Sequence, residues 1–388
     1  MKLRFHPISP VWALPLLVVS AVADTPPPAP LPVNRSLERY GSREEFLRRA
    51  AEFEQARLRR LPFRSVDEDR HFAEKEFSTD LGAGQMIRFR RIAASHYLDG
   101  CTEELKAQVL SVKNRAQDLR RWDNMFETSR RDPVTVPYDF FMSDTIVTNA
   151  MFAAFVRETD YRTSVERYTT GWVVDGKAQW LQGFANDWRL MLPPMSDPDH
   201  PVVQVSWFDA MNFAAWLSGK TGLIFRLPTK EEWLLAARPE TMRDEVCLFP
   251  WGNSLAGIDG KMNFGTRELS DYMWIHDQYA DGHAYSSPVR AYPPNSRGLH
   301  DMLGNVWVWN WTSVAEYEGR AAGPRTSRPS ALDALGAGAN QPMTMQGGCY
   351  LARVSHANLL AKMSHPALDG AEDIGFRLVA VRKADSGL

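Results

Sequence analysis

Cysteine is scarce in this sequence, and so is net charge of either sign. Only Cys101, Cys247 and Cys349 occur in 388 residues, so at most one internal disulfide bond can form. The formal net charge is −2 and no long basic block is present, which gives no electrostatic reason to expect nucleic-acid binding. Long apolar runs are also missing after Ala23, so no later segment has the length of a membrane helix.

The N-terminus has the pattern of a secretory signal peptide. Lys2 and Arg4 precede an apolar stretch over residues 11–22, and Ala21-Val22-Ala23 is a small-x-small cleavage pattern. The apolar stretch is too short to span a bilayer comfortably. We therefore expect residues 1–23 to be removed and the mature protein to reach the periplasm. An uncleaved membrane anchor is the alternative.

Two segments precede the main domain. Residues 24–33 are rich in proline and should form an extended linker. Residues 34–80 are expected to form an amphipathic helical arm, because apolar side chains recur there at helical spacing among many charges. The stripe consists of Leu37, Tyr40, Phe46, Leu47, Ala50, Phe53 and Leu58. It predicts a helix that packs on the main domain, with the docking of a partner as the alternative.

Short strands and helices alternate after Gln85. Alternating or β-favouring residues predict strands at 86–90 and at 135–142, and a charged helical insertion lies between them over about 102–130. Apolar faces predict helices at 149–158, at 207–220 and from Thr229 onward. The last two begin with Ser206 and Thr229, each followed three residues later by an acidic residue, as in a capping box.

The second half of the sequence has few runs long enough for regular elements. From Phe249 onward, Gly, Pro, Asn, Ser and Asp surround isolated tryptophans. Such a loop-rich region needs other support, and bound cations and interleaved indole rings are the natural candidates.

Seven short motifs occur in a fixed order along the chain. They are DTIVTNAMFAAFV (144–156), HPVVQVSW (200–207), RLPTKEEWLLAAR (226–238), FPWGN (249–253), GLHDMLGNVWVW (298–309), GG (347–348) and GFR (375–377). Together they resemble the formylglycine-generating enzyme family, also called sulfatase-modifying factors. The resemblance covers residues 83–383. It implies an α+β fold with a C-type-lectin-like core and little regular secondary structure.

The resemblance also shows what this chain lacks. In active members, a Gly-Gly-Ser-aromatic-Leu segment is followed by one cysteine, and a second cysteine lies five residues further on. That pair binds copper and oxidises a substrate cysteine to formylglycine. Here the segment 347–351 is followed by Ala352, and Ala357 takes the second position. Because alanine can neither bind copper nor pair with a substrate thiol, formylglycine formation and copper are not expected.

Two calcium sites of the family can be followed in the same way. The first resembles Asn263, the Phe264 carbonyl, Asp281 and the His283 carbonyl, which are oxygen ligands suited to a hard cation. We expect structural calcium there. The second resembles Gly304, Asn305 and Val306, but its family glutamate is replaced by Val308. The second site is therefore expected to be weakened or lost.

The resemblance also suggests a binding cleft. Its candidate residues are Trp307, Trp309, Cys349, Tyr350, Arg353 and His356. Core packing is the alternative for two of the three indoles in the 307–311 run, and a buried apolar role is the alternative for Cys349. A carboxylate or phenol at Glu372, Asp373 or Tyr350 could replace the thiols as acid or base. Solvated loop positions are the alternative for these residues.

Three functions remain open at this point. The first is a non-catalytic binding or regulatory protein with an envelope or periplasmic partner, similar to family members that regulate type VI secretion through threonine phosphorylation. The second is a periplasmic oxidase of the same family that matures a peptide or siderophore precursor. The third is a carbohydrate-binding module that uses the tryptophans and calcium.

Overall fold

The computed structural model describes most of the chain after the predicted linker. The described residues are 42–61, 71–112, 131–174, 180–183, 187–269, 275–319, 324–327, 329–331, 340–361 and 363–388. The predicted signal peptide (1–23) and linker (24–33) lie outside them, as does most of the predicted insertion (about 102–130). Of the insertion, helix α4 (Glu103–Leu110) is described and begins at an N-cap threonine, Thr102.

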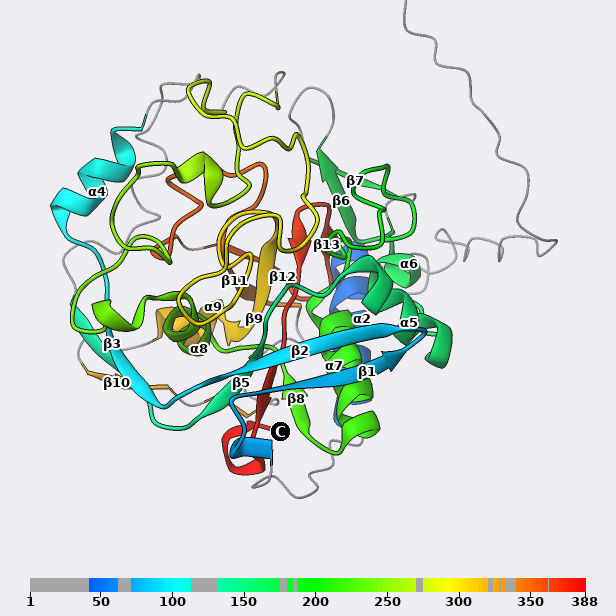
Figure 1. Ribbon diagram of the computed structural model, residues 1–388. Helices are drawn as coiled ribbons and strands as arrows, with labels where there is room; N and C mark the ends of the chain where they lie inside the picture. Colours follow the sequence, from blue (N-terminus) through cyan, green and yellow to red (C-terminus); the bar gives the residue numbers. More distant parts are fainter. Residues whose placement is uncertain are drawn as a thin grey trace, which may run out of the picture.

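A five-stranded antiparallel sheet holds the two ends of the described chain together (Figure 1). Its order is β1 (Glu76–Gly82), β2 (Gln85–Ile92), β5 (Phe140–Ser143), β15 (Val379–Val381) and β8 (Ile224–Arg226). The first strands carry phenylalanines on one face, and the Phe89 ring lies 5.0 Å from the rings of both Phe77 and Phe225. Aromatic side chains therefore form the core on this sheet.

Three smaller sheets carry the rest of the β-structure. One has the order β12 (Met363–Pro366), β11 (Pro342–Gln346), β9 (Trp307–Ser313) and β14 (Ile374–Gly375); another has β13 (Gly370–Ala371), β6 (Gly171–Val174) and β7 (Trp180–Gly183); the third has β10 (Arg325–Thr326), β4 (Asp132–Val136) and β3 (Ser95–Asp99). Residues 370–375 contribute β14 to the sheet that contains β9 and β13 to the sheet that contains β6. This segment therefore lies where those two sheets meet.

The predicted helices are confirmed, together with the caps that start them. They are α5 (Asn149–Thr159), α7 (Trp207–Thr221) and α8 (Lys230–Ala237). Capping boxes begin α7 at Ser206 and α8 at Thr229. The described part of the chain also contains short helices α6 (Ser164–Tyr168) and α9 (Val314–Glu318) and 3-10 turns at Glu240–Met242, Ile258–Gly260 and Lys383–Asp385. Figure 1 shows α5 and α7 beside the β1–β2 end of the large sheet.

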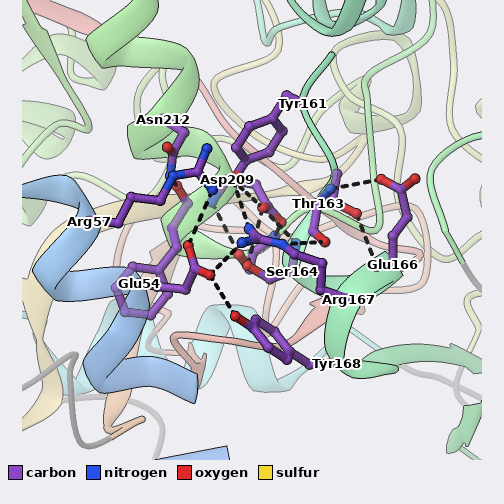
Figure 2. A network of polar contacts seen from close by, with 12 residues as sticks. Glu54, Arg57, Tyr161, Thr163, Ser164, Glu166, Arg167, Tyr168, Asp209 and Asn212 are labelled. Carbon is purple, nitrogen blue, oxygen red and sulfur yellow. Dashed lines mark hydrogen bonds and ion pairs between the residues drawn. The ribbon is translucent and has the colours of Figure 1, made fainter. Parts of the chain in front are cut away.

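The described part of the N-terminal arm before residue 62 is a helix packed on the main domain. Helix α2 (Arg43–Leu58) contacts α7 and buries Glu54 completely. The Glu54 carboxylate accepts hydrogen bonds from Arg167 (2.6 Å) and Tyr168 (2.7 Å), as Figure 2 shows. Packing on the domain is thus confirmed. One member of the predicted stripe, Phe53, is 60% exposed, because the face that contains Glu54 points inward instead.

The boundary predicted between arm and domain needs correction. Strand β1 falls inside the predicted arm (34–80), yet it pairs with β2 from Glu76 to Gly82. Both strands belong to the large sheet, so the β-structure of the main domain begins at Glu76, before the predicted start at residue 83.

Asparagine side chains brace the loop-rich region between residues 249 and 306. The Asn295 amide donates to the Ala236 carbonyl (2.8 Å), and its side-chain oxygen accepts from two backbone N–H groups of its own loop. Asn305 makes two such bonds to the backbone of Ser287, each 3.0 Å long. These contacts satisfy backbone groups that no helix or strand pairs.

The described residues contain neither a disulfide nor a membrane helix. Cys101, Cys247 and Cys349 are all free and buried. Among the described residues, no helix is both long enough and apolar enough to cross a bilayer.

Candidate functional site

The two alanines that replace the family's cysteines lie in a tightly folded segment. Gly347 and Gly348 both adopt positive φ angles, 105° and 77°, and turn the chain back on itself. A Cβ atom at Gly348 would lie 2.6 Å from the Cα atom of Ala357. Ala352 and Ala357 are both buried. Neither side chain can bind copper or form a disulfide.

The thiol of Cys349 is bonded to a buried carboxyl group. Its Sγ atom donates to Oδ2 of Asp373 over 3.2 Å. Burial raises the pKa of the Cys349 thiol well above its usual range, and the Asp373 carboxylate raises it further. Burial also raises the pKa of Asp373 to about 6. Since the thiolate is the reactive form, Cys349 is a poor nucleophile here.

Tyr350 and Glu372 form a second pair beside the first. Glu372 hydrogen-bonds the Tyr350 side chain, and its Oε1 atom accepts from the Val174 N–H (3.1 Å). Burial raises the pKa of Glu372 to about 7. The Tyr350 hydroxyl lies 3.8 Å from the sulfur of Met195. Tyr350 and Asp373 are buried and Glu372 is half-buried, so none of the three is a solvated loop residue.

A third carboxyl group, Asp369, lies just before this pair in sequence. Its Oδ2 atom accepts from the Trp172 indole N–H (2.9 Å) and lies 3.9 Å from Nε2 of His365. Burial raises the pKa of Asp369 to about 6 and lowers that of His365 to about 4. Residues 369–373 therefore hold three carboxyl groups whose pKa values are raised by burial. We call Asp369, Glu372 and Asp373 the carboxyl cluster.

Most of the predicted cleft residues belong to the core. The indole N–H of Trp309 donates to the Val205 carbonyl (3.0 Å), and Trp307 is 4% exposed. His356 contacts the Ser355 hydroxyl (3.0 Å), and burial lowers its pKa to about 3. Arg353 is also buried. Of the six candidates, Cys349 and Tyr350 contact the carboxyl cluster. The buried indoles present no free face for stacking on a sugar ring.

Three exposed apolar side chains belong to segments near Tyr350 and Glu372. Trp180 pairs with Val174, whose N–H binds Glu372, and the Leu192 carbonyl accepts from the Met195 N–H. The Tyr285 ring lies 6.1 Å from that of Tyr350. These three side chains are 43%, 79% and 46% exposed. We call Trp180, Leu192 and Tyr285 the apolar rim. The sequence did not single them out, since exposure depends on tertiary packing.

The residues predicted for the first calcium site do come together. The Asp281 carboxylate accepts from the backbone N–H groups of Phe264 (2.7 Å) and His283 (3.0 Å). The hydroxyl oxygen of Thr266 lies within hydrogen-bonding distance of two carboxylates, those of Asp281 (3.1 Å) and Glu268 (2.5 Å). Its single proton can be donated to only one of them at a time. The buried Oδ1 atom of Asn263 has no hydrogen-bond partner. An unsatisfied buried oxygen on the residue next to Phe264, whose N–H binds the Asp281 carboxylate, fits a hard divalent cation.

The residues predicted for the second calcium site are used differently. The side-chain amide of Asn305 is hydrogen-bonded to the backbone of Ser287. The main-chain carbonyl of Asn305 accepts a hydrogen bond from the Tyr350 N–H (2.9 Å). Gly304 approaches Asn263 closely, since a Cβ atom there would lie 2.1 Å from the Asn263 carbonyl oxygen. Val306 and Val308 are buried apolar residues. In this chain the loop at residues 304–306 therefore connects the backbone at Ser287 with that at Tyr350.

The family model for the sulfatase-modifying factor enzyme 1-like domain matches residues 110–382. This chain belongs to that family. A formylglycine-generating enzyme from Thermomonospora curvata is 31% identical over 270 residues, which cover 62% of this chain and 82% of the enzyme. An inactive C-alpha-formylglycine-generating enzyme 2 from Bos taurus is 31% identical over 253 residues, which cover 60% of this chain and 73% of that protein.

A further relative carries a different name. The serine/threonine-protein kinase pkn1 of Chlamydia pneumoniae is 26% identical over 277 residues, which cover 69% of this chain and 37% of the kinase. The proteins to which this chain is similar are thus named as formylglycine-generating enzymes, as an inactive form of that enzyme and as a kinase.

Solved structures confirm the α+β fold. PvdO from Pseudomonas aeruginosa superimposes with a TM-score of 0.54 at 18% identity, covering 79% of this chain and 98% of PvdO. Treponema denticola variable protein 1 gives a TM-score of 0.50 at 16% identity, covering 79% and 99%. At these identities the likeness concerns the fold alone.

Proposed function

We propose that this protein is an exported, non-catalytic binding protein of the formylglycine-generating family, with a periplasmic or envelope protein as its partner. The observation that carries the proposal is the identity of residues 352 and 357. The family resemblance puts the copper-binding cysteines at these positions, and both are buried alanines. Cys349 cannot take over, because its thiol is buried and bonded to Asp373.

The apolar rim supports a role in binding. Trp180, Leu192 and Tyr285 expose large apolar side chains on segments near Tyr350 and Glu372, and exposed apolar clusters mark interaction sites in many proteins. Aromatic residues are also enriched at the centres of protein interfaces. The partner would cover the rim and leave the carboxyl cluster buried beneath it.

Regulation of type VI secretion through threonine phosphorylation is the process that we propose for this binding role. The proposal rests on the resemblance to regulatory members of the family. The match to a Chlamydia pneumoniae protein named as a serine/threonine-protein kinase supports a link between this type of domain and phosphorylation.

Capture experiments with rim variants test the binding role. The mature protein, immobilised, should retain one stoichiometric protein from periplasmic and envelope fractions. Leu192→Asp and Tyr285→Ala should reduce its retention at least about tenfold, as expected for residues central to an interface. Phe53→Asp is the matched control, because Phe53 is 60% exposed but lies on α2.

Two results would contradict this function. Equal capture by wild type and both rim variants would remove the rim from the interface. Conversion of a cysteine-containing peptide to its formylglycine form by the purified protein, detected by mass spectrometry, would overturn the non-catalytic assignment.

The Tyr350–Glu372 pair favours one alternative, a periplasmic oxidase that matures a peptide or siderophore precursor. A carboxyl group whose pKa is raised to about 7 is suited to general acid–base catalysis near neutral pH. Under this alternative the purified protein would consume oxygen with its substrate, and Glu372→Gln would lower the rate at least about a hundredfold. The binding role predicts no oxygen consumption by either protein.

We also propose that the first predicted calcium site holds calcium. Asn263, Asp281 and the carbonyls of Phe264 and His283 would be the ligands, and the ion would cross-link the loops that carry them. Calcium should raise the unfolding temperature of the wild type and chelator should lower it. In Asp281→Asn both responses should be lost. An unfolding temperature that is the same with calcium and with chelator would contradict the proposal.

A further inference from the structure

Two exposed arginine side chains meet at one buried carboxylate beside the large sheet. Asp144 directly follows β5 and is 2% exposed. The Nη2 atom of Arg290 donates to both of its carboxylate oxygens (2.8 and 2.7 Å). The Nε atom of Arg88, on β2, lies 3.9 Å from Oδ2 of the same carboxylate. Because both nitrogens lie close to one oxygen atom, the two guanidinium groups are neighbours.

The two guanidinium groups carry more charge than their shared carboxylate balances. Within the described part of the chain, Asp144 is the one carboxylate in ion-pair contact with either arginine. Glu76, on the neighbouring strand β1, is bonded to Arg90 instead (2.6 Å). One positive charge is therefore left unbalanced at this surface.

Most of the hydrogen-bond donors of the two arginines are unused. Within the described residues, the Arg88 side chain makes no hydrogen bond, and that of Arg290 bonds through Nη2 alone. The two side chains are 48% and 44% exposed. A guanidinium group has five N–H donors, so several donors on each side chain can reach a ligand from solvent.

The position of Arg290 is fixed by contacts on both its backbone and its side chain. Its φ angle is 69°, an uncommon conformation for a residue other than glycine. Its backbone N–H donates to Oδ2 of Asp301 (3.0 Å) while its guanidinium is held by Asp144. Residues in such conformations cluster at ligand sites, and a side chain that is fixed in advance loses little freedom on binding.

A hydroxyl group lies beside Arg88 on the sheet itself. Ser78 of β1 is directly opposite Arg88 of β2 in the antiparallel pair, and both are exposed; Figure 1 shows the two strands side by side. Residues opposite each other in such a pair have side chains on the same face, with Cβ atoms about 5 Å apart. Ser78 can therefore donate to a group that Arg88 binds.

We propose that Arg88, Arg290 and Ser78 bind a phosphate-monoester group. Such a group carries a charge of about −1.5 to −2 at neutral pH and has three terminal oxygens, which two guanidinium groups and a hydroxyl can share. A carboxylate has one charge and two oxygens, so it would leave donors unused. The site includes no residue of the apolar rim and is independent of the protein-binding role proposed for it.

Titration with the N-acetyl amide of O-phosphothreonine, followed by calorimetry or NMR, tests this inference. We expect saturable binding with a Kd below about 1 mM that weakens as the salt concentration rises. The corresponding derivatives of threonine and of glutamate should bind at least about tenfold more weakly, because they lack the doubly charged group.

Inorganic phosphate distinguishes two sources of the same group. Binding of inorganic phosphate as tight as that of the phosphothreonine derivative would support the site and assign it to the free ion. Tighter binding of the derivative would support the site and assign it to a phosphorylated side chain.

Substitutions at exposed positions test which residues bind the group. Arg88→Gln should weaken binding at least about tenfold, as expected for charge-assisted hydrogen bonds, and Ser78→Ala about fivefold. Both variants should keep the wild-type unfolding temperature. Arg189→Gln is the matched control, because Arg189 is 45% exposed and forms an ordinary ion pair with Glu166 (2.6 Å). It should bind the derivative as the wild type does.

Three outcomes would overturn the inference. The first is the absence of saturable binding by the wild type in this range. The second is equal binding of the phosphothreonine and glutamate derivatives, a comparison that needs no variant. The third is wild-type affinity in a folded Arg88→Gln protein, which would place the bound phosphate elsewhere.

Discussion

At the residue scale, Gly348 combines a positive φ angle with a close approach to a neighbouring backbone segment. Its φ angle is 77°, and a Cβ atom would collide with Ala357. Gly84 has nearly the same φ angle, 75°, but open space around it. We predict that Gly84→Ala costs about 1–2 kcal/mol of unfolding free energy, from backbone strain alone. Gly348→Ala should cost at least about 2 kcal/mol more, because overpacking adds to the strain. Urea unfolding of both variants measures the difference, and equal costs would contradict the close packing at Ala357.

The carboxyl group of Glu372 should make stability depend on pH. Burial raises its pKa in the folded protein to about 7 from an ordinary value of 4.5. The folded state therefore binds the proton more tightly than the unfolded state does. The contribution of this group to stability is fully present below about pH 4.5 and is lost as the pH rises to about 7.

Comparison with Glu372→Gln isolates that contribution. Glutamine does not titrate, so the unfolding free energy of the wild type minus that of the variant should fall by about 2–3 kcal/mol between pH 4.5 and 7.5. The buried histidines, His356 and His365, titrate in the opposite direction but are present in both proteins and cancel. A difference that stays constant with pH would contradict the burial of Glu372.

At the scale of elements, the attachment of α2 depends on one buried carboxylate. Glu54 is fully buried against Arg167, which is itself largely covered, and Figure 2 shows the two side chains pointing at each other between the helices. Removal of one partner of a buried pair leaves the other charge unpaired. We predict that Glu54→Ala lowers the unfolding free energy by about 3 kcal/mol.

Glu52 provides the matched control on the same helix. Its side chain is 51% exposed and is paired with Arg48, so Glu52→Ala should change stability by less than about 0.5 kcal/mol. Protease sensitivity of α2 should rise in Glu54→Ala alone. Similar effects of the two substitutions would mean that α2 is held by its apolar contacts.

The helices and strands also show which local sequence patterns were sufficient to predict secondary structure. Capping boxes at Ser206 and Thr229 predicted where α7 and α8 begin, because the cap is a contact between residues three positions apart. The apolar stripe of the arm gave a helix but misplaced Phe53, since the burial of Glu54 requires a distant arginine. Strand β1 was assigned to the arm because its partners in the sheet are not visible in its own residues.

At the scale of the whole molecule, motif order predicted the family and the α+β fold, and tertiary contacts decided the site. The alanines at 352 and 357 could be read directly from the sequence. Of the carboxyl cluster, Glu372 and Asp373 could be named only as candidates and Asp369 was not singled out, because the pKa shifts come from burial. The apolar rim joins residues 180, 192 and 285, which no local pattern connects.

The position of β15 has a consequence for how the chain folds. This strand, close to the C-terminus, pairs with β5 on one side and with β8 on the other. The large sheet therefore cannot close before its last strand arrives. Such long-range pairing has a high contact order, which predicts slow and cooperative folding. A chain that forms its central sheet only at the end remains unfolded while it is being made, the state in which a polypeptide can be threaded through a narrow translocation channel.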